Sequence, residues 1–108
     1  MIAKKQRLTT RAFHTFFAEG KKIHTPLFTA VYTPHATLHV SVVVSKKVAR
    51  RAVDRNKLRR RVYNAVRTYV EKHNSDGVFI FLMKKEAFKV EYAVLKDGIE
   101  TFLNKTIA

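Results

Sequence analysis

The sequence predicts a single-domain α+β protein, a sandwich of one central, mostly antiparallel sheet with helices packed against it. Three observations support this fold class. The length of 108 residues matches one domain spanning residues 1–108. The hydrophobic content is 46%, with eight Phe and four Tyr, which is enough for a core. The predicted elements follow the order helix, strand, strand, helix, strand, helix, which one sheet with helices against it accommodates.

A first helix is predicted over residues 9–19, after a loose basic lead at residues 1–6. Thr9 and Thr10 suit the N-cap, and Gly20 follows where a C′ glycine ends many helices. The apolar side chains form two rows at i, i+4 spacing, one of Leu8, Ala12 and Phe16 and the other of Phe13 and Phe17. So wide an apolar surface on a short helix indicates that the helix faces two partners.

Three strands and two more helices complete the predicted fold. Residues 27–32 and 38–45 alternate as half-buried strands do, and in the second strand His39, Ser41 and Val43 oppose the apolar side. A long helix ends near His73, before a turn. Residues 78–83 are an unbroken apolar run, which predicts a central strand buried on both faces. A last helix is predicted over residues 90–104, with Gly98 as a weak point inside it.

The charge of the chain indicates a polyanionic partner. The 22 Lys and Arg against 8 Asp and Glu give a net charge of +14. Nucleic acid is the first candidate and an anionic membrane surface the second. Residues 46–61 hold nine Lys or Arg and one acidic residue, Asp54, so a charge of +8 is concentrated in sixteen residues.

This basic segment continues into an amphipathic helix rather than a disordered arm. Its apolar residues repeat at three and four residues, and comprise Leu58, Val62, Ala65, Val66 and Tyr69. A ladder at i, i+4 spacing begins beside the apolar face and consists of Arg55, Arg59, Tyr63 and Arg67. The opposite side carries Asn56, Lys57, Arg60 and Asn64. Because neighbouring like charges destabilise a helix, this pattern predicts a phosphate-bearing partner, with a merely solvated surface as the alternative.

Other site chemistries find little support. The chain has no Cys, which excludes disulfides, thiol nucleophiles and Cys-based zinc sites. Among the five His, His35 and His39 flank a strand, and surface or RNA-contacting roles are favoured over metal binding. No segment is apolar enough for a signal peptide or a membrane span, so we expect a soluble, cytoplasmic protein.

The basic segment and the first helix resemble the protein component of bacterial ribonuclease P. That family carries Ser-Lys-Lys at a strand end and then a helix with Arg-Asn-Arg and further basic residues. The sequence here reads Ser45-Lys46-Lys47, followed by Arg55-Asn56-Lys57, Arg59 and Arg60. Upstream, Phe13, Phe17 and Gly20 reproduce the spacing of the family's first helix, and the resemblance spans residues 7–103. Lys57 and Tyr63 stand where the family usually has Arg.

The resemblance implies a fold with a left-handed βαβ crossover around the basic helix. It also implies the function of an accessory subunit, in which a catalytic RNA removes the 5′ leader of precursor tRNA. Magnesium ions bound to the RNA activate water in that reaction. The protein would bind the catalytic RNA and the leader, hold no cofactor or metal of its own, and contribute no catalytic residue.

Two sets of binding residues follow from the resemblance. The contacts to the RNA subunit would be Lys46, Lys47, Arg50, Asn56, Lys57, Arg60 and Arg67. The leader would lie in a cleft between the first helix and the sheet, against Phe13, Phe17, Ala30 and Tyr32, with Arg55, Arg59 and Tyr63 along its edge. Aromatic platforms beside basic residues suit single-stranded RNA. The alternative is that Phe13, Phe16 and Phe17 all belong to the core.

Two other functions remain open from the residues. A structural RNA-binding protein of the ribosomal type would share the charge but lack the substrate cleft. A nuclease acting through its own side chains is less well supported, because the acidic residues are scattered and form no cluster for a metal.

Overall fold

The structure, a computed structural model, describes residues 10–73 and 76–107. The expected basic lead, Leu8 and Thr9 lie outside the described residues. The elements in chain order are α1 (Thr10–Glu19), β1 (Lys21–His24), β2 (Phe28–Thr33), β3 (Leu38–Val43), α2 (Ala52–His73), β4 (Gly77–Met83), α3 (Lys85–Lys89) and α4 (Tyr92–Ile107).

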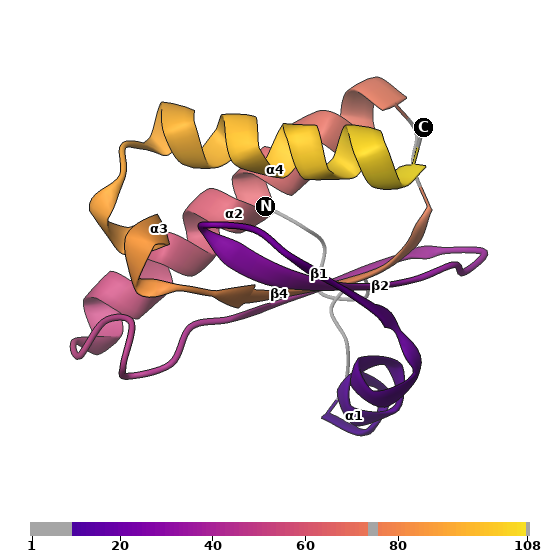
Figure 1. The fold of residues 1–108 in the computed structure, drawn as a ribbon, viewed down its shortest axis with the longest axis horizontal. Coiled ribbons are helices and arrows are strands. Elements are labelled where there is room, and N and C mark those ends of the chain that lie inside the picture. Colours follow the sequence, from indigo (N-terminus) through magenta and orange to yellow (C-terminus); the bar gives the residue numbers. More distant parts are fainter. Residues whose placement is uncertain (1–9, 74–75, 108) are drawn as a thin grey trace.

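The four strands form one sheet in the order β1-β2-β4-β3 (Figure 1). β1 pairs with β2 and β2 with β4 in antiparallel fashion, whereas β3 and β4 are parallel. The predicted α+β class and mostly antiparallel sheet are therefore confirmed. The parallel pair is joined through α2, which makes the expected βαβ unit, and the left hand of its crossover stays a prediction.

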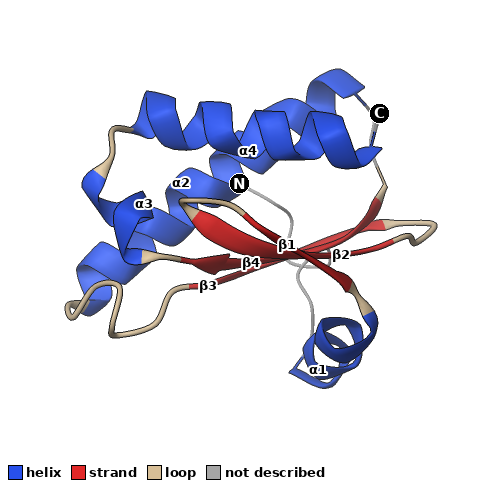
Figure 2. Ribbon diagram, viewed as in Figure 1, coloured by secondary structure: helices blue, strands red, loops and turns tan. Residues whose placement is uncertain are grey.

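The helices cover the two faces of the sheet unequally. α2 and α4 lie side by side on one face, and α1 lies alone on the other (Figure 2). The main core fills the α2–α4 side, where the Phe102 ring packs against the rings of Phe28 and Phe81, at 5.7 Å between centroids in each case. Phe79 and Phe81 of β4 point into this core, while Val78 and Ile80 are buried on the α1 side. β4 is thus the central strand buried on both faces that its apolar run predicts.

The sequence analysis did not predict two of the elements, β1 and α3. β1 contains only one apolar residue in four, so neither alternation nor hydrophobicity marks it, and its lysines suit an exposed edge strand. α3 precedes the predicted last helix, which begins at Tyr92 instead of residue 90. The break is at Val90, whose extended backbone (φ −95°, ψ 159°) ends α3.

Gly20 ends α1 for a steric reason. The expected C′ position is confirmed, because its N–H donates to the Phe16 carbonyl at 2.8 Å. However, Gly20 does not have a positive φ angle. Among the described glycines, that conformation belongs to Gly77, whose φ is 125°. A Cβ at Gly20 would overlap Cγ1 of Val31 and lie 2.9 Å from Oγ1 of Thr33. Gly20 therefore permits the close approach of α1 to β2.

Within the described ranges, no helix combines the length and apolar character needed to cross a bilayer.

Candidate nucleic-acid interface

α2 separates its apolar and basic sides as the sequence predicts. The side chains packed into the core are Leu58, Val62, Tyr63, Ala65, Val66 and Tyr69. Asn56, Lys57 and Arg60 are exposed on the other side, and Arg67 is exposed two turns further along. Six buried side chains anchor the helix, so its cations are held at the surface of a rigid element.

The loop before α2 is fastened to the helix by Arg55. The Arg55 guanidinium, at Nη1, donates to the carbonyl of Ala49 at 3.1 Å and to that of Arg50 at 2.6 Å. The loop also closes on itself, because the N–H groups of Val48 and Ala49 donate to the Ser45 carbonyl. Arg55 was expected at the edge of a leader cleft, and the structure uses it to hold the backbone that carries Lys46, Lys47 and Arg50.

A basic hollow of about 550 Å³ opens beside this loop, lined by Lys46, Lys47, Val48, Arg50 and Lys85. Lys85 was missed by sequence reasoning. The parallel pairing of β3 and β4 explains its position, because parallel strands end at the same edge of the sheet. The chain leaving β3 and the chain leaving β4 therefore deliver their lysines to one place. The signal available in the sequence was the pair Lys84-Lys85 directly after the central strand.

Most cations of this region lack an acidic partner. In the described residues, Asp54 pairs with Arg51 at 3.8 Å and Glu71 with Arg67 at 3.9 Å. Arg59 donates to the side-chain oxygen of Asn56. Within residues 10–73 and 76–107, no ion pair involves the residues we call the basic surface, which are Lys46, Lys47, Arg50, Lys57, Arg60 and Lys85. Uncompensated, exposed cations at this density attract phosphate groups.

The α1 aromatics form a second, separate surface. The rings of Phe13 and Phe17 are stacked with centroids 5.8 Å apart, and the Lys22 ammonium lies 4.9 Å from the centre of Phe17. Phe16 turns the other way and meets His35 edge-on at 5.8 Å. All three Phe are half-buried and none belongs to the main core, which argues against the alternative of a purely core role.

The structure does not assemble the expected cleft from all its residues. Ala30 is 0% exposed and Tyr32 packs on Phe79 at 5.1 Å, so both face the α2–α4 side of the sheet. Alternation along β2 places Val31 and Thr33 toward α1 instead. Tyr63 is 7% exposed and lies within the core, and Arg55 and Arg59 belong to a helix on the face opposite α1 (Figure 1). Among the seven expected leader contacts, Phe13 and Phe17 stack on each other in α1, whereas the other five belong to β2 and α2.

Other residues share the α1 side of the sheet. His39 and Ser41 are half-buried and Val43 is 36% exposed on the outer face of β3, as its alternation predicts. His35 and His39 approach each other across the β2–β3 connection, with ring centroids 5.3 Å apart, and both contact the Thr37 hydroxyl. Of the residues on this side, His35 meets Phe16 of α1 and Lys22 lies at Phe17 of α1, and the sequence analysis assigned neither to this surface.

In the part of the chain that the structure describes, no three His, Asp or Glu side chains gather closely enough to hold a metal ion. The expectation that the protein binds no metal stays a prediction.

Comparison with known proteins agrees with this architecture. A family model described as Ribonuclease P matches residues 2–107. No curated protein matches the chain. A Staphylococcus aureus RNase P protein mutant with defective mRNA degradation activity superposes with a TM-score of 0.76 at 22% identity, covering 94% of this chain and 87% of that one. The RNase P protein from Thermotoga maritima gives a TM-score of 0.74 at 21% identity, covering 94% and 98%. Because the family model spans nearly the whole chain, the protein belongs to the Ribonuclease P family.

Proposed function

We propose that this chain is the protein subunit of a ribonuclease P ribonucleoprotein, which assists a catalytic RNA in removing the 5′ leader from precursor tRNA. Family membership supports a role in ribonuclease P and in tRNA 5′ processing. The observation that carries the finer proposal is the basic surface, whose cations are exposed and unpaired in the described residues. The basic surface argues against a nuclease that holds its own metal, and the family match favours this function over a ribosomal-type RNA-binding protein, which would share the charge.

The basic surface is the proposed contact to the RNA subunit. Lys46, Lys47, Arg50 and Lys85 surround one hollow. α2 begins at Ala52, directly after the loop, so Asn56, Lys57 and Arg60 extend the same region. Arg groups bind phosphate oxygens in pairs, and Lys groups act as point charges. Arg67 contributes less in this proposal because Glu71 already neutralises part of its charge.

The α1 surface is the proposed contact to the single-stranded leader. Phe13 and Phe17 form an aromatic stack, and the Lys22 ammonium lies over the Phe17 ring. This combination is typical of sites that bind single strands through base stacking. Our proposal leaves Ala30, Tyr32 and Tyr63 out of this contact, because they pack on the α2–α4 side, and gives Arg55 a positioning role because it holds the loop carbonyls.

Catalysis is assigned to the RNA in this proposal. A two-metal hydrolysis needs clustered oxygen ligands. In the described basic region the acidic side chain is Asp54, and it faces Arg51. A surface so rich in Lys and Arg attracts an anionic partner and repels Mg²⁺. In this proposal the magnesium ions therefore belong to the RNA subunit.

Reconstitution tests the proposal. The protein is mixed with a bacterial ribonuclease P RNA and precursor tRNA at low magnesium concentration, and cleavage at the mature 5′ end is measured. We expect no cleavage by the protein alone and strong stimulation of the RNA. Failure to stimulate an RNA subunit that is active at high magnesium would refute the assignment.

Phe17→Ala tests the leader contact in the same assay. Loss of one stacking platform should weaken binding of precursor tRNA by about 1–3 kcal/mol and leave binding of mature tRNA unchanged. Phe88→Ala is the matched control, because Phe88 is an exposed Phe of α3, on a different element from the α1 surface. Equal losses for precursor and mature tRNA would remove the leader contact from α1.

A further inference from the structure

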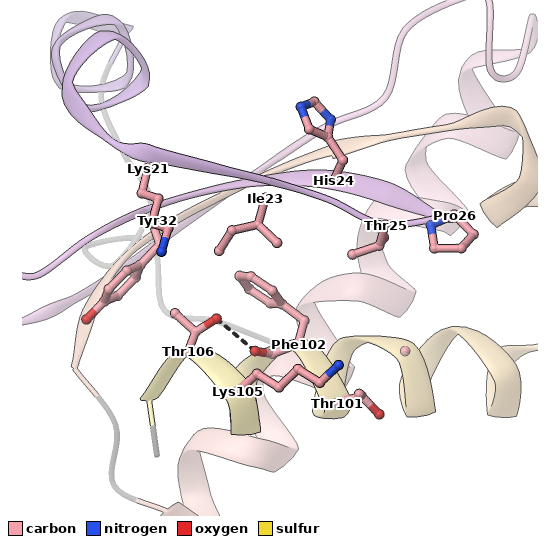
Figure 3. A pocket seen from close by; sticks show the side chains of 11 residues that line it. Lys21, Ile23, His24, Thr25, Pro26, Tyr32, Thr101, Phe102, Lys105 and Thr106 are labelled. Carbon is pink, nitrogen blue, oxygen red and sulfur yellow. Dashed lines mark hydrogen bonds between the residues drawn. The ribbon is translucent and has the colours of Figure 1, made fainter.

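A pocket of about 670 Å³ lies between β1 and α4, on the sheet face opposite α1 (Figure 3). Neither proposed RNA contact uses it. Its volume falls within the range typical of small-ligand sites. Figure 3 shows Phe102 pointing from α4 toward Ile23 of β1, with Tyr32 and Lys21 at one end of the pocket.

The floor of the pocket is apolar and partly aromatic. Phe102 is 4% exposed and held by three other Phe rings of the core, so its position is rigid. Ile23 and Tyr32 are half-buried and pack against the same core. A rigid floor of this kind suits a flat, apolar group such as a nucleobase.

The rim of the pocket is basic. Lys21 comes from β1 and Lys105 from α4, and the lining contains no acidic residue, while the His24 ring points to the other side of the sheet (Figure 3). Within the described residues, neither lysine takes part in an ion pair. The Thr106 hydroxyl donates to the Phe102 carbonyl at 2.8 Å, and the hydroxyls of Thr101 and Tyr32 add neutral polar groups to the two lysines. The rim therefore selects an anionic group.

Gly98 lines the pocket from α4. Glycine inside a helix is less favourable than alanine, and α4 nevertheless runs through Gly98 without a break. A Cβ there would meet Cδ1 of Leu27, at 3.4 Å, which is an ordinary contact. Leu27 and Gly98 also line an adjoining hollow, so packing leaves room for a methyl group on that side.

We propose that the β1–α4 pocket binds a nucleotide, with the base against Phe102, Tyr32 and Ile23 and the phosphate at Lys105; Lys21 lies at the other end of the pocket, beside Tyr32 (Figure 3). The nucleotide comes either from free solution or from a single-stranded RNA that crosses the β1 edge. The second source is consistent with β1 itself, because adjacent Lys21 and Lys22 face opposite sides of the sheet. The site does not depend on the proposed ribonuclease P function.

Binding is tested by NMR on the full-length chain, with adenosine 5′-monophosphate, adenosine and inorganic phosphate as probes. The amide signals of pocket residues such as Thr101 and Thr106 should shift with the monophosphate, and less with either of its parts. A short oligoadenylate forms a second arm. Shifts of the same signals at lower oligonucleotide concentration identify an RNA strand as the source, and shifts with the monophosphate alone identify a free nucleotide.

Two variants separate this site from non-specific attraction to a basic protein. Lys105→Gln should weaken monophosphate binding roughly three- to tenfold. Lys96→Gln, on the same helix but outside the pocket, should leave it unchanged. The proposal is overturned if the pocket signals do not shift, or if Lys105→Gln and Lys96→Gln bind equally well.

Discussion

Replacing Gly20 with Ala tests how closely α1 is bound to the sheet. The new Cβ would overlap Cγ1 of Val31 and lie 2.8 Å from the Phe16 carbonyl oxygen. Val31 is 1% exposed, so its side chain has little space into which to rotate. Adding a methyl group to a packed site costs about 1–3 kcal/mol. The lower chain entropy of Ala in the unfolded state offsets about 0.4–1 kcal/mol of this cost.

The net destabilisation is therefore about 1–2 kcal/mol. For a domain of this size it corresponds to a fall in Tm of roughly 5–10 °C. Thermal unfolding followed by circular dichroism measures it, with Gly98→Ala as the control, because a Cβ at Gly98 makes only an ordinary contact.

The same substitution has a functional consequence. α1 carries Phe13 and Phe17 and rests on β2 and β4 through few contacts, so α1 is the element that yields to the overlap. Precursor tRNA binding should weaken while binding of the RNA subunit persists. A Tm at or above that of the unmodified protein would refute the reasoning, since it would show that Val31 relaxes without cost.

Three further substitutions test the basic surface and the core. Arg55→Ala removes two hydrogen bonds to loop carbonyls and should lower the free energy of unfolding, measured by urea titration, by about 1 kcal/mol. Arg55→Lys should restore only part of this stability. An Arg55→Ala variant as stable as the unmodified protein would show that the loop does not need these bonds. Arg60→Ala should lower the slope of log binding constant against log salt concentration, for binding to the RNA subunit, by about one unit. Arg67→Ala should lower this slope by less, because Arg67 is paired with Glu71. Equal slopes for the two variants would contradict the proposed interface. Tyr69→Phe removes the 2.8 Å hydrogen bond to Asn104 that joins α2 to α4 and should destabilise the protein by about 1 kcal/mol, as measured by its urea midpoint.

The agreement between sequence and structure is greatest in elements whose apolar side chains are buried. The apolar rows of α2 and the continuous apolar run of β4 both depend on burial, and each occurs where the sequence predicts it. β1 and α3 are too short and too polar to leave such a pattern. Their presence is decided by neighbours: β2 offers an open edge to Lys21–His24, and the end of β4 leads directly into Lys85.

The candidate site divides in the same way. The basic residues were predictable because exposed Lys and Arg need no particular neighbour to reach solvent. The leader cleft could not be predicted in this way. Alternation along β2 shows that Ala30 and Tyr32 share a face of the sheet, but it does not show which helix covers that face. Ala30 and Tyr32 pair in register with Phe81 and Phe79, and these rings face α4.

By itself, the sequence determined the fold class, the amphipathic basic helix, the central strand and the concentration of positive charge, because each follows from local periodicity or composition. Only the tertiary structure decided that α1 and α2 occupy opposite faces of the sheet, that Lys85 joins Lys46 and Lys47, and that a pocket opens between β1 and α4. These juxtapositions depend on strand order and on the parallel pairing of β3 with β4, which bring together residues far apart in the chain.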